Sequence, residues 1–223
     1  YNNNKTHIQI EIEPSDKNFI YDFTEDHFDK KIDKSLNYNI TLNDIKLNFN
    51  KNTFYHDTSI DLNFEKDTLT VYNPNIILKN SYQVKFPEND KGNFVGSLDK
   101  NNNVIYVSSN SKEGYFEYKT KTLGKFFIST DTIGPIIKKI NKKNHTNNEK
   151  IRFLIRDEGT GIKKYAARIN NEWALFEYEP KKNLIQFKPD DFIQLKEENE
   201  LFIVVEDLLG NKTIYNETIY YKP

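Results

Sequence analysis

The residues best suited to chemistry lie in two acidic turns in the second half of the chain. The segment IRDEGTGI contains Asp157 and Glu158, and the segment EDLLGN contains Glu206 and Asp207. Carboxylates that converge can bind calcium, which takes about six to eight oxygen ligands. The same side chains can instead accept hydrogen bonds from the backbone of their own turns. Only the calcium interpretation requires the two turns to lie close together.

The turn interpretation is favoured over a cation or anion site. Neither segment has the Asp-x-Asp-x-Asp spacing of a dedicated calcium loop, and the glycines supply the backbone angles that turns need. We therefore expect no metal ion here, calcium included. If one binds, its candidate ligands are Asp157, Glu158 and Asp207. A phosphate cradle is disfavoured, because the Gly-Thr-Gly segment lacks a P-loop lysine and a following helix, and its acidic neighbours repel phosphate.

Two further sets of residues could act in binding or catalysis. Trp173, the single tryptophan, could stack on a sugar, which makes it the candidate ligand-binding residue. A lone tryptophan in a strand more often packs against a sandwich core, and we expect this second arrangement. His56 and Asp57 could pair as a base and its orienter, but neighbours in a strand face opposite sides and no nucleophile motif accompanies them. We predict a surface or turn role for this pair.

The composition indicates that these residues are carried by β-strands. The chain of 223 residues has 16 Phe and 14 Tyr, and aromatic side chains favour pleated sheets. The absence of cysteine excludes disulfides and thiolate metal sites. The 32 basic and 33 acidic residues nearly cancel, so no nucleic-acid footprint is present. No apolar run approaches the roughly 20 residues of a transmembrane segment.

Short alternating runs, separated by Asn, Asp, Gly and Pro, predict an all-β protein. In the first half, the predicted strands are 7–13, 59–64, 81–86, 104–109, 114–119 and 125–130.

A domain boundary is predicted at Gly134-Pro135, because proline interrupts a strand ladder. Seven runs follow at the spacing of an immunoglobulin-like sandwich, which we assign to residues 132–223. In that strand order the second and sixth runs point the same way, so Asp157 and Asp207 should share one pole. The seven runs are 136–140, 149–157, 162–169, 172–178, 183–188, 199–207 and 211–221.

Two local patterns refine this second module. Asn170-Asn171 tolerates the positive φ angles of a tight hairpin between the third and fourth runs. Since there is no cysteine pair, burial alone must hold the two sheets together. The residues expected to face one another are Ile151, Phe153 and Ile155 on one sheet, and Leu201, Ile203 and Val205 on the other.

An ordered series of phrases resembles the C-terminal region of secreted, lysostaphin-like (LytM-type) zinc metallopeptidases of Bacteroidetes-type bacteria. The similarity spans about residues 40–221, and in that family a peptidase domain precedes β modules of this kind. The phrases are DT.GP at 131–135, D..TGI at 157–162, NNEWALFEY at 170–178 and D..GN.T at 207–213.

The resemblance implies an accessory region and not an active site. The family's zinc motif pairs His-x-x-x-Asp with a later His-x-His, and none of the four histidines, His7, His27, His56 and His145, has this spacing. No catalytic residue is therefore carried over, no cofactor is expected in this region, and zinc is expected only in an upstream peptidase domain.

The implied function is that of spacer or targeting modules in a peptidoglycan-directed metallopeptidase. Such a protein would be secreted or reside in the bacterial cell envelope, periplasmic or associated with the outer membrane. Its partners would be the upstream peptidase domain and peptidoglycan or another glycan. The alternative is a stand-alone cell-surface adhesion or glycan-binding protein that uses Trp173 and exposed tyrosines.

Two assignments complete the predicted organisation. Residues 15–131 would form a β module similar to the ZU-type sandwich of ankyrins and netrin receptors. The segment NNKTHIQIEIEP resembles the chain end GNKTIYNETIYYKP. Residues 1–14 would therefore be the last strand of an upstream immunoglobulin-like module.

Overall fold

The protein is all-β in the residues that the computed structural model describes. The helical structure there is a single 3-10 turn, η1 (Pro180–Lys182). No helix in this part of the chain is long and apolar enough to cross a membrane. The strand expected at 7–13 and the upstream-module strand assigned to 1–14 lie outside it. The described residues are 18–23, 27–73, 75–140, 144–146, 149–189, 193 and 195–222.

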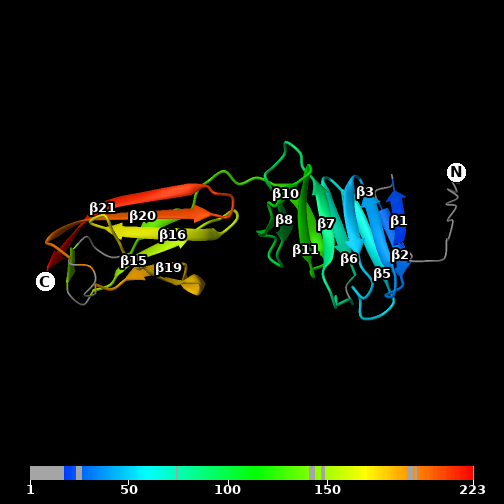
Figure 1. Ribbon diagram of the computed structural model, residues 1–223, viewed down its shortest axis with the longest axis horizontal. Coiled ribbons are helices and arrows are strands. Elements are labelled where there is room, and N and C mark those ends of the chain that lie inside the picture. Colours follow the sequence, from blue (N-terminus) through cyan, green and yellow to red (C-terminus); the bar gives the residue numbers. More distant parts are fainter. Residues whose placement is uncertain are drawn as a thin grey trace. The chain divides into compact units, whose positions relative to one another are not determined.

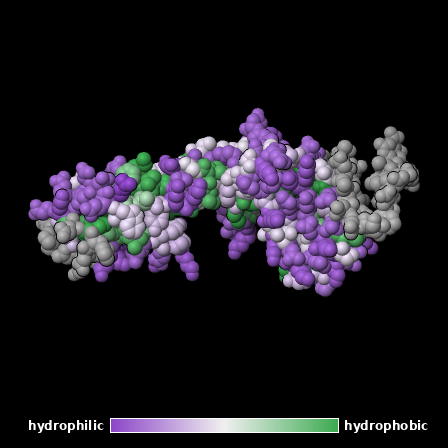
Figure 2. Space-filling view, in the orientation of Figure 1, coloured by the Kyte–Doolittle hydropathy of each residue, from purple (hydrophilic) through white to green (hydrophobic). Residues whose placement is uncertain are grey.

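The described residues form two compact units. One lies within residues 1–88 and 110–127, and the other lies within residues 89–109 and 128–223. Hydrophilic residues cover much of both units on the face drawn in Figure 2, in keeping with the 29% of charged residues in the chain. The two sandwiches are described separately below, each by the strands that pair within its sheets.

The strands of the first sandwich are arranged in two six-stranded sheets (Figure 1). One sheet has the order β1 (Asn18–Phe23), β3 (Asn37–Leu42), β4 (Ile45–Phe49), β7 (Tyr82–Pro87), β11 (Tyr115–Thr120) and β10 (Ser111–Lys112). The other has the order β2 (His27–Ile32), β5 (Thr58–Glu65), β6 (Thr68–Tyr72), β12 (Gly124–Ser129), β8 (Phe94–Leu98) and β9 (Val104–Ser108).

Strict alternation in β3 and β4 directs their apolar side chains inward, where Leu42, Ile45 and Leu47 are fully buried. A two-residue turn joins these strands, and both its residues, Asn43 and Asp44, have positive φ. This geometry matches the right-handed twist of a hairpin. The turn contains no glycine, and the sequence analysis predicted neither β3 nor β4.

The second sandwich packs a four-stranded sheet on a five-stranded sheet. The four-stranded sheet has the order β13 (Ile136–Lys139), β15 (Ile151–Arg156), β19 (Leu184–Phe187) and β18 (Glu177–Glu179). The five-stranded sheet has the order β14 (Asn144–Thr146), β21 (Lys212–Lys222), β20 (Glu198–Asp207), β16 (Ile162–Ile169) and β17 (Glu172–Trp173). The predicted sandwich architecture is confirmed.

The core of this sandwich contains the residues expected from the alternation. The six apolar side chains predicted on facing strands all belong to one buried cluster. The Phe153 ring packs against two others in this core, and its centroid lies 6.2 Å from that of Phe176 and 5.1 Å from that of Tyr215. Burial of such side chains contributes roughly 1.5–3 kcal/mol each, so the sheets are held together without a disulfide.

The fourth predicted run, 172–178, is wrong as a single strand. The chain forms β17, leaves the five-stranded sheet, and then joins the four-stranded sheet as β18. Between the two strands, Ala174 and Phe176 are buried in the core. The preceding tight hairpin is confirmed, because Asn170 and Asn171 have φ angles of 52° and 68°.

Candidate functional site

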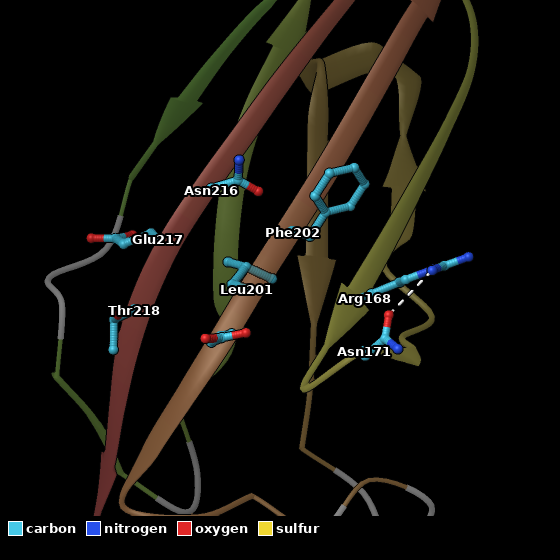
Figure 3. A pocket seen from close by; sticks show the side chains of 8 residues that line it. Arg168, Asn171, Leu201, Phe202, Asn216, Glu217 and Thr218 are labelled. Atoms are coloured by element: carbon cyan, nitrogen blue, oxygen red, sulfur yellow. Dashed lines mark hydrogen bonds between the residues drawn. The ribbon is translucent and has the colours of Figure 1, made fainter.

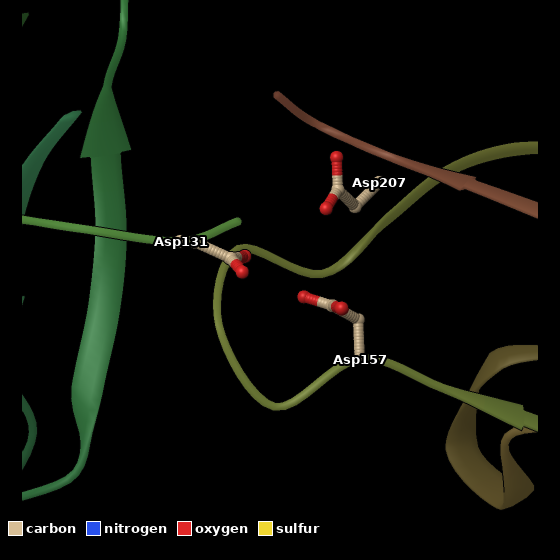
Figure 4. Close-up of side chains that lie close together, drawn as sticks. All are labelled: Asp131, Asp157 and Asp207. Atoms are coloured by element: carbon tan, nitrogen blue, oxygen red, sulfur yellow. The ribbon is translucent and has the colours of Figure 1, made fainter. Parts of the chain in front are cut away.

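Three aspartates meet at one end of the second sandwich. Strands β15 and β20 run in the same direction in opposite sheets, so the turns that contain Asp157 and Asp207 emerge together. Asp131, which precedes β13, joins them, and one carboxylate oxygen from each residue lies within 4.8 Å of the other two (Figure 4). We call these three residues the acidic pole. The prediction that Asp157 and Asp207 share one pole is confirmed.

Asp157 organises its own turn. Its Oδ2 accepts backbone N–H hydrogen bonds from Gly159 at 3.1 Å, Thr160 at 2.7 Å and Gly161 at 2.7 Å. Gly161 has a φ of 92°, which favours glycine. Three donors directed at one oxygen stabilise its negative charge and fix the chain reversal after β15.

Asp207 is fully buried and makes an equivalent set of contacts. Its Oδ1 accepts the backbone N–H groups of Leu209 at 2.8 Å and Asn211 at 2.9 Å, and its Oδ2 accepts the Asn211 Nδ2 at 2.8 Å. The buried charge is therefore hydrogen-bonded through both of its oxygens. Asp207 connects β20 to β21 as Asp157 connects β15 to β16.

The sequence analysis missed Asp131 as a member of this group, although it begins the DT.GP phrase. Its Oδ1 accepts the backbone N–H of Ile133 at 3.1 Å, and its Oδ2 accepts the Thr160 hydroxyl at 3.1 Å. A Cβ atom at Gly159 would clash with Asp131 Oδ2. Glycine at position 159 thus permits the close approach of Asp131 to the turn that contains Asp157.

The two glutamates expected at this pole lie elsewhere. Glu158 is 73% exposed along its side chain and pairs with Arg156 at 3.0 Å. The Glu206 carboxylate lies within 4.0 Å of three lysines, Lys163, Lys164 and Lys212. Of the four carboxylates in the two acidic turns, those of Asp157 and Asp207 lie at the pole, and Asp131 supplies the third. The two glutamates point elsewhere because side chains at successive strand positions point to opposite faces.

The acidic pole combines two chemical properties. Three carboxylates within 4.8 Å offer oxygens to a cation, although calcium takes about six to eight. Each carboxylate also accepts hydrogen bonds from nearby backbone or side-chain donors, which stabilise the charges without an ion. These hydrogen bonds explain the three aspartates as residues that form and hold turns.

A second group of polar residues lies on the outer face of the five-stranded sheet. Here Arg168, Phe202 and Asn216 are directly opposite one another on β16, β20 and β21, and they form one cross-strand row (Figure 3). The row crosses a hollow of about 890 Å³. We call this region the outer-face hollow, and its lining includes Arg168, Asn171, Glu200, Phe202, Asn216 and Thr218.

Trp173 extends this row by one strand. Its register partner is Arg168, so the indole and the guanidinium lie on the same face of the sheet. The expectation that Trp173 packs in the sandwich core is wrong, because the residue is 67% exposed. The physical reason is the early end of β17, after which Ala174 and Phe176 provide the buried side chains.

The remaining candidates are not brought into a common site. His56 and Asp57 line a separate hollow in the first unit with Tyr55, Ile77 and neighbouring residues. Both residues are exposed, which agrees with the surface role that we predicted, and Asp57 Oδ1 accepts the backbone N–H of Lys34 at 3.1 Å. His7 lies outside the described residues.

Comparisons with known proteins add little to this description. No protein-family model matches the chain, and no curated protein matches it. Fibronectin(III)-like modules of Clostridium thermocellum CbhA are similar at 13% sequence identity, over 64% of this chain and 86% of that chain, with a TM-score of 0.32. A TM-score this low does not establish a shared fold, so the architecture rests on the strand order and the core.

Proposed function

We propose that these residues are a non-catalytic accessory region of a larger secreted or cell-envelope protein of a bacterium. Their role is to space or target a peptidoglycan-directed zinc metallopeptidase domain that lies upstream. Sandwich modules suit this role, because a rigid scaffold can present loops and sheet faces for binding.

The observation that supports this proposal is the convergence of the family-like phrases. DT.GP, D..TGI and D..GN.T are far apart in the sequence, yet their aspartates are the three members of the acidic pole. The series therefore belongs to one interlocked structural unit, which supports reading the resemblance as that of a whole module. The glycines of the last two phrases, Gly161 and Gly210, both have a φ of 92°.

A stand-alone adhesion or glycan-binding protein is the second candidate. The exposure of Trp173 favours it, because an indole that is accessible to solvent can stack on a ligand ring. The position of Trp173 beside Arg168 adds a hydrogen-bond donor to that surface.

The sequence of the complete gene separates the two candidates. An upstream domain with His-x-x-x-Asp and His-x-His would reject the stand-alone protein, and a gene without such a domain would reject the accessory region.

Co-sedimentation with purified peptidoglycan tests the targeting role. Enrichment of the purified chain over an unrelated β-sandwich domain is expected if the modules target the enzyme. Equal sedimentation of the two proteins would reject targeting and restrict the proposal to spacing.

A further inference from the structure

The polar side chains of the outer-face hollow point away from the core of the second sandwich. Arg168 and Asn216 are exposed, and they flank the half-buried Phe202 on the adjoining strands. Glu200 and Thr218 form the next outward-facing pair along β20 and β21. The hollow therefore presents an apolar ring surrounded by hydrogen-bonding groups.

These groups include both donors and acceptors. The Arg168 guanidinium donates a hydrogen bond to Asn171 Oδ1 at 3.3 Å, which orients both side chains at the end of the hairpin. The remaining guanidinium N–H groups can donate, while the Glu200 carboxylate can only accept and the Asn216 amide does both. A ligand with many hydroxyl groups, each a donor and an acceptor, matches such a surface.

The charges of the hollow favour a neutral ligand. Arg168 and Glu200 carry opposite charges on the same face. The Glu217 carboxylate accepts hydrogen bonds from the Lys139 ammonium at 2.7 Å and from the Tyr215 hydroxyl at 2.9 Å. The hollow therefore has no excess positive charge for an anion and no excess negative charge for a cation.

Two aromatic side chains lie at either side of Arg168 in the same row. Phe202 is inside the hollow, and Trp173 lies one strand further out. Neighbouring strands are about 4.8 Å apart, so the backbone positions of the two residues are about 9–10 Å apart. Two aromatic side chains carried at such positions on one face can contact successive sugar units of one chain by their apolar faces.

We propose that the outer-face hollow binds a neutral saccharide chain, with Phe202 and Trp173 against the sugar faces and with Arg168, Glu200 and Asn216 on the hydroxyl groups. Its volume of about 890 Å³ lies within the range of about 300–1,000 Å³ of small-ligand sites. The inference rests on the proposed function, since it names the ligand and the surface through which targeting would occur.

The test is a titration of the isotope-labelled chain with chitotetraose and with cellotetraose. Binding is monitored through the amide chemical shifts. The proposal predicts that at least one neutral tetrasaccharide shifts amides of residues 168–173, 200–202 and 216–218, with saturation. Phe202→Ala should weaken this binding up to about tenfold, the loss expected for one ring contact. The control Tyr72→Ala, which removes an exposed aromatic side chain from the first unit, should leave the binding unchanged.

Several outcomes would overturn the inference. These are shifts confined to other residues, no shifts with either neutral saccharide, and binding of the polyanion polygalacturonate alone. Self-association that Phe202→Ala abolishes would show that the surface contacts a second copy of the chain instead. Mapping on the wild-type chain decides between these outcomes even if a variant fails to fold.

The two proposals fail in different ways. Peptidoglycan co-sedimentation that Arg168→Ala and Phe202→Ala leave unchanged would reject the hollow and retain targeting. Binding of chitotetraose at the hollow without peptidoglycan co-sedimentation would reject targeting and retain the hollow.

Discussion

The acidic pole and the outer-face hollow are two polar regions of one sandwich, and they use their polar groups in opposite ways. At the pole, Asp157 and Asp207 each accept three hydrogen bonds from their own turns. In the hollow, Arg168 and Asn216 project from strands toward solvent (Figure 3). The comparison teaches that a cluster of charged residues marks a binding site only when its hydrogen-bonding capacity is left for a ligand.

This difference predicts separate experimental signatures. Substitutions at the pole should lower the free energy of unfolding, because they leave part-buried donors without acceptors. Substitutions in the hollow should change ligand binding and leave stability nearly constant, because they remove solvent-directed groups.

The largest effect is expected for Asp207→Ala. The substitution removes a fully buried carboxylate and leaves the N–H groups of Leu209 and Asn211 without acceptors. We expect a loss of about 3 kcal/mol in the free energy of unfolding, measured by urea denaturation. The matched control is Glu158→Ala, which removes an exposed carboxylate near the same pole and should cost less than about 0.5 kcal/mol. Equal losses in both variants would contradict the structural role of the pole.

A smaller effect should appear at high pH. Burial, together with the hydrogen bond to Glu217, raises the pKa of Tyr215 from 10.0 to about 12. The folded chain therefore retains this proton after the unfolded chain has lost it, so the free energy of unfolding should fall between about pH 10 and pH 12. Denaturation at a series of pH values over this range should show that the free energy of unfolding falls less steeply with pH in Tyr215→Phe than in the wild type. The same pH dependence of the free energy of unfolding in both proteins would mean that folding does not raise the pKa of Tyr215.

The sequence determined much of the second sandwich and of its pole. Alternation in 151–155 and 201–205 predicted the facing core residues. The shared direction of the second and sixth runs predicted the meeting of Asp157 and Asp207. Asp131 was not found, because its contact with Thr160 depends on how a segment before the first strand folds back.

Other features depended on local geometry that the alternation does not encode. Trp173 was placed in the core because 172–178 looked like one strand, whereas the chain changes sheets within it. Strands β5 and β6 are joined by Lys66-Asp67, which adopt positive φ without a glycine. The alternation predicted β5 as the run 59–64 and did not predict β6.

Arg168→Ala should barely change stability. The side chain is exposed and donates one hydrogen bond, to the exposed Asn171. We expect a change within about 0.5 kcal/mol in the free energy of unfolding. A loss comparable to that of Asp207→Ala would mean that the hollow is part of the scaffold, and the contrast between the two regions would disappear.

The smallest effect is expected from calcium. If hydrogen bonds from nearby donors stabilise the pole, melting curves in calcium and in EDTA should superimpose. A cation present at about 100 times its dissociation constant would stabilise the fold by about 2.7 kcal/mol. Such a gain would raise the melting temperature by several degrees and would redefine the pole as a metal site.

The most direct test of the contrast between the two regions is one pair of titrations on a single isotope-labelled sample, read through amide chemical shifts. We predict that chitotetraose or cellotetraose shifts the amides around Arg168, Phe202 and Asn216, and that calcium leaves those of Gly159–Gly161 and Leu209–Asn211 in place. Saturable calcium shifts at the pole, together with no saccharide shifts in the hollow, would contradict the account.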